Sequence, residues 1–87
     1  MDKSIHTDEY ELLVDLLREA RASAGLTQVE LAKKLKQSQS FVSKMEVGER
    51  RLDLVQLRTV CIALGTTLPE FVAKWEERLA QKRKGKK

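Results

Sequence analysis

The stretch LTQVELAKKLKQSQSFVSKMEVGERRLDL, residues 26–54, contains two short amphipathic patterns that follow one another closely. Leu31, Ala32 and Leu35 make one apolar stripe at helical spacing, and Val42 and Met45 begin the next. Isolated helices shorter than about 12–15 residues are only marginally stable in water. The pattern therefore predicts two short helices that are held in place by packing against the rest of the chain.

Helix-capping side chains mark where these two segments begin. Thr27 and Glu30 form a capping box, in which each side chain accepts a hydrogen bond from the backbone amide of the other. Ser38 has the residue type and the position of a second N-cap. We therefore expect the first helix at about residues 27–35 and the second at about residues 38–47.

Three further helical patterns surround this pair. The first starts at Asp8 and ends before Gly25, the second lies between a cap at Asp53 and Gly65, and the third follows a cap at Thr67. Their apolar stripes are Leu12, Leu13, Leu16, Leu17 and Ala20, then Leu54, Leu57, Val60, Cys61 and Leu64, then Phe71, Val72, Trp75 and Leu79. The sequence predicts an all-α fold, a compact bundle of five helices.

The length of 87 residues suits a single domain. We place this domain at residues 8–80, between a loose lead-in at residues 1–7 and a basic, flexible tail at residues 81–87. The first 30 residues carry a net charge of −4, whereas the remaining 57 carry +8. A basic middle and tail suit a polyanionic partner, although a lysine-rich terminus is as often a solvated tail.

The composition argues against several classes of protein. One cysteine, Cys61, allows neither an internal disulfide nor a multi-cysteine metal site, and the single His6 has no ligand-like neighbours. No apolar run is long enough to span a membrane, and the acidic N-terminus does not fit a signal peptide. No nucleophile with a base partner and no phosphate-binding glycine loop is apparent. We expect a cytoplasmic protein that is not an enzyme and has no metal, cofactor, membrane or small-molecule ligand.

The second short helix has a polar face opposite its apolar stripe. That face carries Gln39, Ser40, Ser43 and Lys44. Glutamine can form two hydrogen bonds to adenine, lysine can donate to the acceptors of guanine, and serine can donate or accept. The N-termini of both short helices also offer backbone amides to phosphate groups. A bracing helix followed by a helix with such a face is typical of a helix-turn-helix that enters the DNA major groove.

Two longer runs carry a more specific resemblance. GLTQVELAKKL, residues 25–35, and SQSFVSKMEVGERRLDLVQLRTVCIALG, residues 38–65, resemble the XRE family of helix-turn-helix regulators, which are lambda-repressor-like and Cro-like proteins. The resemblance covers about residues 12–75, which is most of the chain. It implies a five-helix DNA-binding domain that acts as a homodimer on a double-stranded operator with two-fold symmetry.

The same resemblance implies roles for individual residues. Base-reading positions match Gln39, Ser40, Ser43 and Lys44, and phosphate-contacting positions match Gln28, Ser38, Gly48, Arg50 and Arg51. Arg21 and Glu46 match an ion pair that ties the first helix to the end of the reading helix. The family usually has glycine at the turn where this chain has Lys36, and a left-handed backbone there would cost roughly 1 kcal/mol relative to glycine. Val47 stands where the family often has a polar asparagine.

Several of these side chains have an ordinary alternative role. Gln28 and Gln39 could be ordinary exposed residues at the starts of helices, although contact with DNA is favoured within the full pattern. The two serines and Lys44 could simply be solvated. Arg50 and Arg51 could be charges on the surface of the bundle. Phe41 could pack on the bundle or press against sugar and thymine methyl groups of DNA, and packing is the better fit.

The last helix and the function of the whole chain leave two further alternatives open. Phe71, Trp75 and Leu79 either close the core or form a dimer interface, and Trp75 suits an interface best because aromatic residues are enriched there. The main functional prediction is a transcription regulator, a repressor or autoregulator, that reads a pseudo-palindromic operator. The alternative is a protein-interaction module of the same fold, such as an antitoxin or a coactivator.

Overall fold

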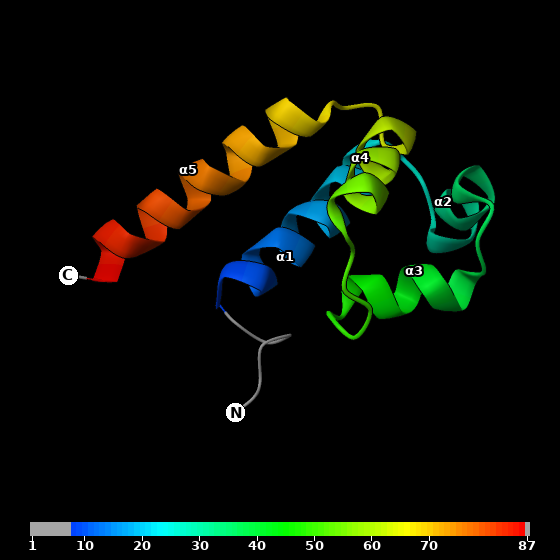
Figure 1. Ribbon diagram of the computed structural model, residues 1–87, viewed down its shortest axis with the longest axis horizontal. Helices are drawn as coiled ribbons and strands as arrows, with labels where there is room; N and C mark the ends of the chain where they lie inside the picture. Colours follow the sequence, from blue (N-terminus) through cyan, green and yellow to red (C-terminus); the bar gives the residue numbers. More distant parts are fainter. Residues whose placement is uncertain (1–7, 87) are drawn as a thin grey trace.

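The computed structural model describes residues 8–86, with side chains described for residues 8–82. Five helices make up this part of the chain, and it contains no strand (Figure 1). They are α1 (Asp8–Ser23), α2 (Gln28–Leu35), α3 (Gln39–Glu46), α4 (Leu54–Ala63) and α5 (Leu68–Lys86). The predicted all-α class and the five-helix bundle are confirmed.

The helices enclose one apolar core, with α1 at its centre. Helix α1 packs against α5 and α3, α2 packs against α3 and α4, and α4 packs against α5. The side chains of Leu17, Leu31, Val42, Met45 and Cys61 have no exposed surface. Complete burial of an aliphatic side chain of this size is worth about 1.5–3 kcal/mol. This shared core holds the two short helices in place, as their length required.

The predicted caps are present at the starts of the inner helices. The Glu30 amide donates to Thr27 Oγ1 at 3.1 Å, and the Thr27 amide donates to Glu30 Oε1 at 2.9 Å. Ser38 Oγ accepts from the Phe41 amide at 3.1 Å. A second capping box joins Asp53 to Gln56 at the start of α4. Each helix therefore begins one residue after its predicted cap.

The turn between α2 and α3 depends on a left-handed residue. Lys36 has a φ of 58°, and it is the only non-glycine residue with positive φ in the described part of the chain. Its amide donates to the carbonyl of Lys33, and the Gln37 amide donates to the carbonyl of Ala32 at 2.9 Å. The turn thus keeps the backbone geometry that glycine would adopt more easily.

Two details of the sequence prediction differ from the structure. Helix α5 continues to Lys86, whereas the sequence placed the end of the helix near residue 80 and a flexible tail after it. Leu54 is 67% exposed rather than inward-facing, because it is the first residue of α4 and precedes the turn that packs on the core. The lead-in at residues 1–7 lies outside the described residues. None of the described helices is both long and apolar enough to cross a membrane.

Candidate nucleic-acid interface

Helices α2 and α3 pack through small and branched side chains, and this fixes which face of α3 is outside. Ala32 is 3% exposed and Val42 is fully buried, both belong to the shared core, and α2 and α3 are packed together. The opposite face of α3 carries the predicted reading residues. Gln39, Ser40 and Lys44 are exposed and Ser43 is half-buried. The orientation that the sequence predicted for α3 is therefore the one observed.

A buried carboxylate lies at the end of α3, beneath that face. Glu46 is only 1% exposed, the one charged residue in the core of the described chain. Arg21 donates to it twice, from Nε to Oε2 at 2.6 Å and from Nη2 to Oε1 at 2.9 Å. The ion pair that the family resemblance implied is present, and it joins α1 to α3. The Glu46 carboxylate raises the pKa of the Arg21 guanidinium above its ordinary value, mainly through these hydrogen bonds.

The hydrogen-bond chain continues from Glu46 to the surface. Gln28 Nε2 donates to Glu46 Oε1 at 3.0 Å, and Gln39 Nε2 donates to Gln28 Oε1 at 2.7 Å. A carboxylate can only accept, so Gln28 must present its NH₂ group inward and its carbonyl oxygen outward. That oxygen in turn requires an N–H from Gln39. The buried charge therefore sets the orientation of both amides.

This orientation decides what Gln39 can offer to a ligand. Its Oε1 and the second hydrogen of its Nε2 are not used in the contact with Gln28. One acceptor and one donor side by side are the complement of the N6 amino group and N7 of adenine in the major groove. Gln28 is half-buried and serves here as a support for Gln39.

Helix α1 also holds the end of α3 through backbone contacts. Arg18 Nη1 donates to the Glu46 carbonyl at 2.6 Å, in addition to the bonds from Arg21 to the Glu46 side chain. Arg21 Nη1 also donates to the Leu26 carbonyl at 3.0 Å, in the segment between α1 and α2. The carbonyls at the C-terminus of a helix lack intrahelical donors and carry the negative end of its dipole, so a cation is favoured there. The position of α3 thus depends on two arginines of α1.

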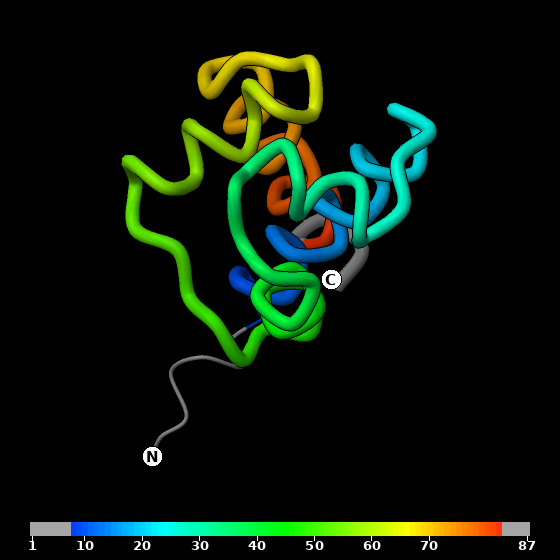
Figure 2. Tube along the Cα trace, turned by 90° about the vertical axis from the view of Figure 1, so that its right-hand side faces the viewer, coloured from blue at the N-terminus to red at the C-terminus, as the bar shows by residue number. Residues whose placement is uncertain are grey.

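The segment between α3 and α4, residues 47–53, forms an arch at the edge of the bundle, seen in Figure 2 from the side of α2 and α3. Gly48 has a φ of 85°, a conformation that side chains with a Cβ rarely adopt. The amides of Glu49 and Arg50 both donate to the Lys44 carbonyl, at 2.9 and 3.1 Å. The arch is therefore fastened to the last turn of α3.

The two arginines of this arch lie over aromatic rings. The Arg50 guanidinium carbon is 5.1 Å from the centre of the Phe41 ring, and that of Arg51 is 4.4 Å from the centre of the Tyr10 ring. Both are cation–π distances. Phe41 is half-buried and packs against the core, in agreement with the packing alternative. Both arginines are exposed on the surface.

Some contacts here have no signal in the sequence. Tyr10 lies 40 residues before Arg50 in the chain, and the sequence pattern gave it no role. The contact of Gln28 with Glu46 could have been found from the implied Arg21–Glu46 pair, because a buried carboxylate needs more than one donor. Ser38 is exposed, and its hydroxyl oxygen caps α3.

The candidate dimer-interface residues fall into two groups. Phe71 is 3% exposed and belongs to the core, so core closure is the alternative that the structure supports for this residue. Trp75 and Leu79 are half-buried. Trp75 Nε1 donates to the Glu9 carbonyl at 2.9 Å and so ties α5 to the first turn of α1.

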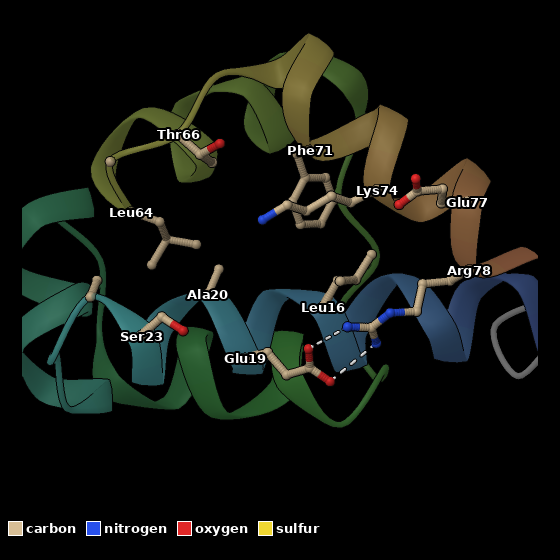
Figure 3. Close-up of a pocket in the computed structure, with 12 residues that line it drawn as sticks. Leu16, Glu19, Ala20, Ser23, Leu64, Thr66, Phe71, Lys74, Glu77 and Arg78 are labelled. Atoms are coloured by element: carbon tan, nitrogen blue, oxygen red, sulfur yellow. Dashed lines mark hydrogen bonds and ion pairs between the residues drawn. The ribbon is translucent and has the colours of Figure 1, made fainter.

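A cleft of about 530 Å³ lies away from this face, between α1 and α5 (Figure 3). Leu16, Ala20, Leu64 and Phe71 form its apolar part, and the Arg78–Glu19 ion pair crosses its edge. The described residues contain no group of histidine, cysteine and carboxylate side chains that could hold a metal ion.

Comparisons with known proteins agree with this geometry. A helix-turn-helix family model matches residues 17–71. An XRE-family like protein from Pseudomonas syringae pv. tomato str. DC3000 is 47% identical, with a TM-score of 0.79, over 86% of this chain and 92% of that one. The clp gene regulator ClgR from Corynebacterium glutamicum is 29% identical, with a TM-score of 0.76, over 87% of this chain and 81% of that one. No curated protein matches in sequence.

A more distant structure shares the fold alone. The wild-type restriction-modification controller protein C.Esp1396I is 19% identical, with a TM-score of 0.79, over 86% of this chain and 99% of that one. That controller protein has also been described as a tetramer in complex with its natural 35 base-pair operator. The family match covers the whole of α2, the turn, α3, the arch and α4. The chain belongs to the XRE family of helix-turn-helix DNA-binding regulators.

Proposed function

We propose that this protein is a sequence-specific regulator of transcription that binds double-stranded DNA by placing α3 in the major groove. The observation that carries the proposal is the outward Gln39, whose amide is oriented through Gln28 by the buried Glu46. A surface glutamine without such a role would have no need of a support that reaches into the core. Bound at a promoter, the protein acts most simply as a repressor or autoregulator, by excluding the polymerase.

The side chains of α3 divide the work of recognition. Gln39, Ser40, Ser43 and Lys44 read base edges, with adenine as the base that fits the Gln39 amide. Gln28, Ser38, Gly48, Arg50 and Arg51 contact phosphates on either side of the groove. All of these residues except Gln28 lie on α3 or within five residues of its ends, and Gln28, at the start of α2, contacts Gln39. A single docking orientation therefore serves all of them.

The proposed assembly is a homodimer on a pseudo-palindromic operator. Two-fold symmetric regulators of this kind place half-sites about 10 base pairs apart, one helical turn. Trp75 and Leu79 on α5 are the interface candidates that remain after Phe71 is assigned to the core. The controller protein that shares this fold is an oligomer on its operator, which supports oligomeric binding here.

The test has two steps, selection of bound sequences from a random DNA pool and then titration of variants on the selected site. Gln39→Ala should cost about 1–3 kcal/mol in binding and relax the preference at one base position of each half-site. Arg50→Ala should weaken all sequences about equally and flatten the salt dependence. Gln81→Ala, an exposed glutamine on α5, is the matched control and should change neither.

The outcomes separate the two functional classes. A symmetric selected site that loses its preference with Gln39→Ala supports the regulator. A pool with no enriched sequence, or a Gln39→Ala variant with an unchanged preference, contradicts it. Binding that is tight only at low salt and indifferent to sequence would instead favour a protein-interaction module.

A further inference from the structure

The first turn of α1 contacts the arch between α3 and α4 at three consecutive residues. Tyr10 Oη donates to the Arg50 carbonyl at 3.5 Å and accepts from the Leu52 amide at 3.3 Å. The ring of the same tyrosine lies under the Arg51 guanidinium at 4.4 Å. Tyr10 is only 7% exposed and belongs to the core, while one face of its ring and its hydroxyl contact the arch.

Tyr10 lies outside the segment that the family model matches, which begins at residue 17. The turn that carries it is anchored from the other end of the chain, because Trp75 Nε1 donates to the Glu9 carbonyl at 2.9 Å. Trp75 also lies outside the matched segment, which ends at residue 71. Tyr10 therefore contacts the arch from a turn of α1 that Trp75 holds through the neighbouring Glu9.

We propose that Tyr10 is a positioning residue for DNA binding, which holds the arch and the Arg51 guanidinium in the geometry that contacts the phosphate backbone. The inference rests on the proposed function. An arch with no regular structure would have to be ordered when DNA binds, and that loss of conformational freedom weakens binding. Tyr10 orders it in advance, through two hydrogen bonds and one stacked ring.

The position of Arg51 suits a phosphate ligand. Its guanidinium carbon lies 4.4 Å from the centre of the Tyr10 ring, which is a cation–π distance, and the N–H donors of a guanidinium bind phosphate in pairs. The contribution of Tyr10 is therefore expected to be independent of DNA sequence, because phosphates carry no sequence information directly. This separates Tyr10 from Gln39, whose contribution is expected to depend on one base.

Two substitutions separate the parts of this contact. Tyr10→Phe keeps the buried ring and removes both hydrogen bonds of the hydroxyl, and it should weaken binding to selected and scrambled DNA equally, by about threefold to tenfold. Tyr10→Leu also removes the ring under Arg51. The plot of log affinity against log salt should become less steep by about 0.9, the value of one lost phosphate contact.

A double-mutant cycle shows whether Tyr10 acts through Arg51. If it does, Tyr10→Leu combined with Arg51→Ala should bind DNA with about the slope of Arg51→Ala alone, because the same contact is lost in both. Leu12→Ala, a half-buried residue of α1, is the control for loss of stability without loss of an arch contact. It should lower the melting temperature and leave the salt slope of the folded protein unchanged.

A measurement without DNA keeps the inference separate from the proposed function. The Leu52 amide should exchange its hydrogen about tenfold faster in Tyr10→Phe than in the parent protein, since its acceptor is gone. Two results would overturn the role of Tyr10 even if the parent protein binds its operator. One is an unchanged exchange rate of the Leu52 amide in Tyr10→Phe. The other is a folded Tyr10→Leu variant whose affinity depends on salt as steeply as that of the parent. A parent protein without sequence preference refutes the proposed function, and accelerated exchange would then support only the ordering of the arch.

Discussion

Among the described residues, two arginine–glutamate pairs join one helix to another, and they have similar geometry but very different exposure to solvent. Arg21 and Glu46 join α1 to α3, with side chains 20% and 2% exposed. Arg78 and Glu19 join α5 to α1, with side chains 39% and 55% exposed (Figure 3). Each pair makes two hydrogen bonds, and the shortest distance in each is 2.6 Å.

The difference lies in what surrounds each carboxylate. Glu46 has lost its water and must be satisfied by protein donors, which brings Gln28 and through it Gln39 into one connected network. Glu19 keeps access to water and has Arg78 as its hydrogen-bond partner. A buried charge thus orients side chains at the surface above it through a chain of hydrogen bonds, whereas the hydrogen bonds of an exposed pair join only its two members. The same substitution made in both pairs should show this.

The largest effect is expected for Glu46→Gln. The change leaves the Arg21 cation without its carboxylate. It also places an NH₂ group, itself a donor, against the N–H donors of Arg21 and Gln28. The free energy of unfolding should therefore fall by about 3 kcal/mol. For a domain of this size that is a decrease of more than about 12 °C in melting temperature. Denaturant titration measures it. A loss below about 1 kcal/mol would mean that burial of Glu46 does not matter.

A second and smaller effect is expected for Gln28→Ala, which breaks the network between the core and Gln39. Stability should change by less than about 1 kcal/mol, because Glu46 keeps both bonds from Arg21. Affinity for the selected operator should fall about tenfold, since Gln39 must then be ordered on binding. Fluorescence anisotropy with labelled DNA reports this. Parent affinity in this variant would show that the Gln39 amide needs no support.

A third effect, smaller again, is expected for Glu19→Gln, the counterpart of the Glu46 substitution. An exposed pair contributes at most about 1 kcal/mol, and salt reduces it further. Operator affinity should not change, because the pair lies between α1 and α5 and away from α3. The comparison fails if Glu19→Gln destabilises the protein as much as Glu46→Gln does.

The smallest effect is a pH dependence of the exposed pair. The hydrogen bonds from Arg78 lower the pKa of Glu19 below its ordinary value of 4.5. A carboxylate whose pKa is lower in the folded state stabilises the protein above its unfolded pKa, and this stabilisation is lost as the pH falls through the folded pKa. The stability difference between the parent and Glu19→Gln should therefore be constant near neutral pH and disappear below pH 4.5. A difference that grows under acid would have the wrong sign.

Much of the fold follows from local signals in the sequence. The capping residues Thr27, Ser38 and Asp53 act on amides within three residues of themselves, so their positions alone set where α2, α3 and α4 begin. The left-handed turn at Lys36 came from comparison with a glycine-containing pattern, since nothing in lysine itself requires it. The outward face of α3 followed from the inward stripe.

The features that were not predicted depend on contacts between residues far apart in the chain, or on helix ends that no capping residue marks. The end of α5 was placed too early because a run of charged residues was interpreted as a tail, although lysine, glutamine and arginine are good helix formers. The assignment of Phe71 to the core needs the position of α1, which no local pattern supplies. The contacts of Tyr10 join residues about 40 positions apart, and tyrosine there fits the stripe of any amphipathic helix.

The reactivity of the Cys61 thiol can be used to measure how often the core of the protein opens. The sole thiol in the chain has no exposed surface, and burial raises its pKa to about 11. At neutral pH a folded molecule therefore offers neither access nor thiolate to an alkylating reagent. Chemical labelling at this position therefore counts only molecules in which the core around Cys61 has opened. Where opening equilibrates faster than labelling, the rate gives the free energy of that opening.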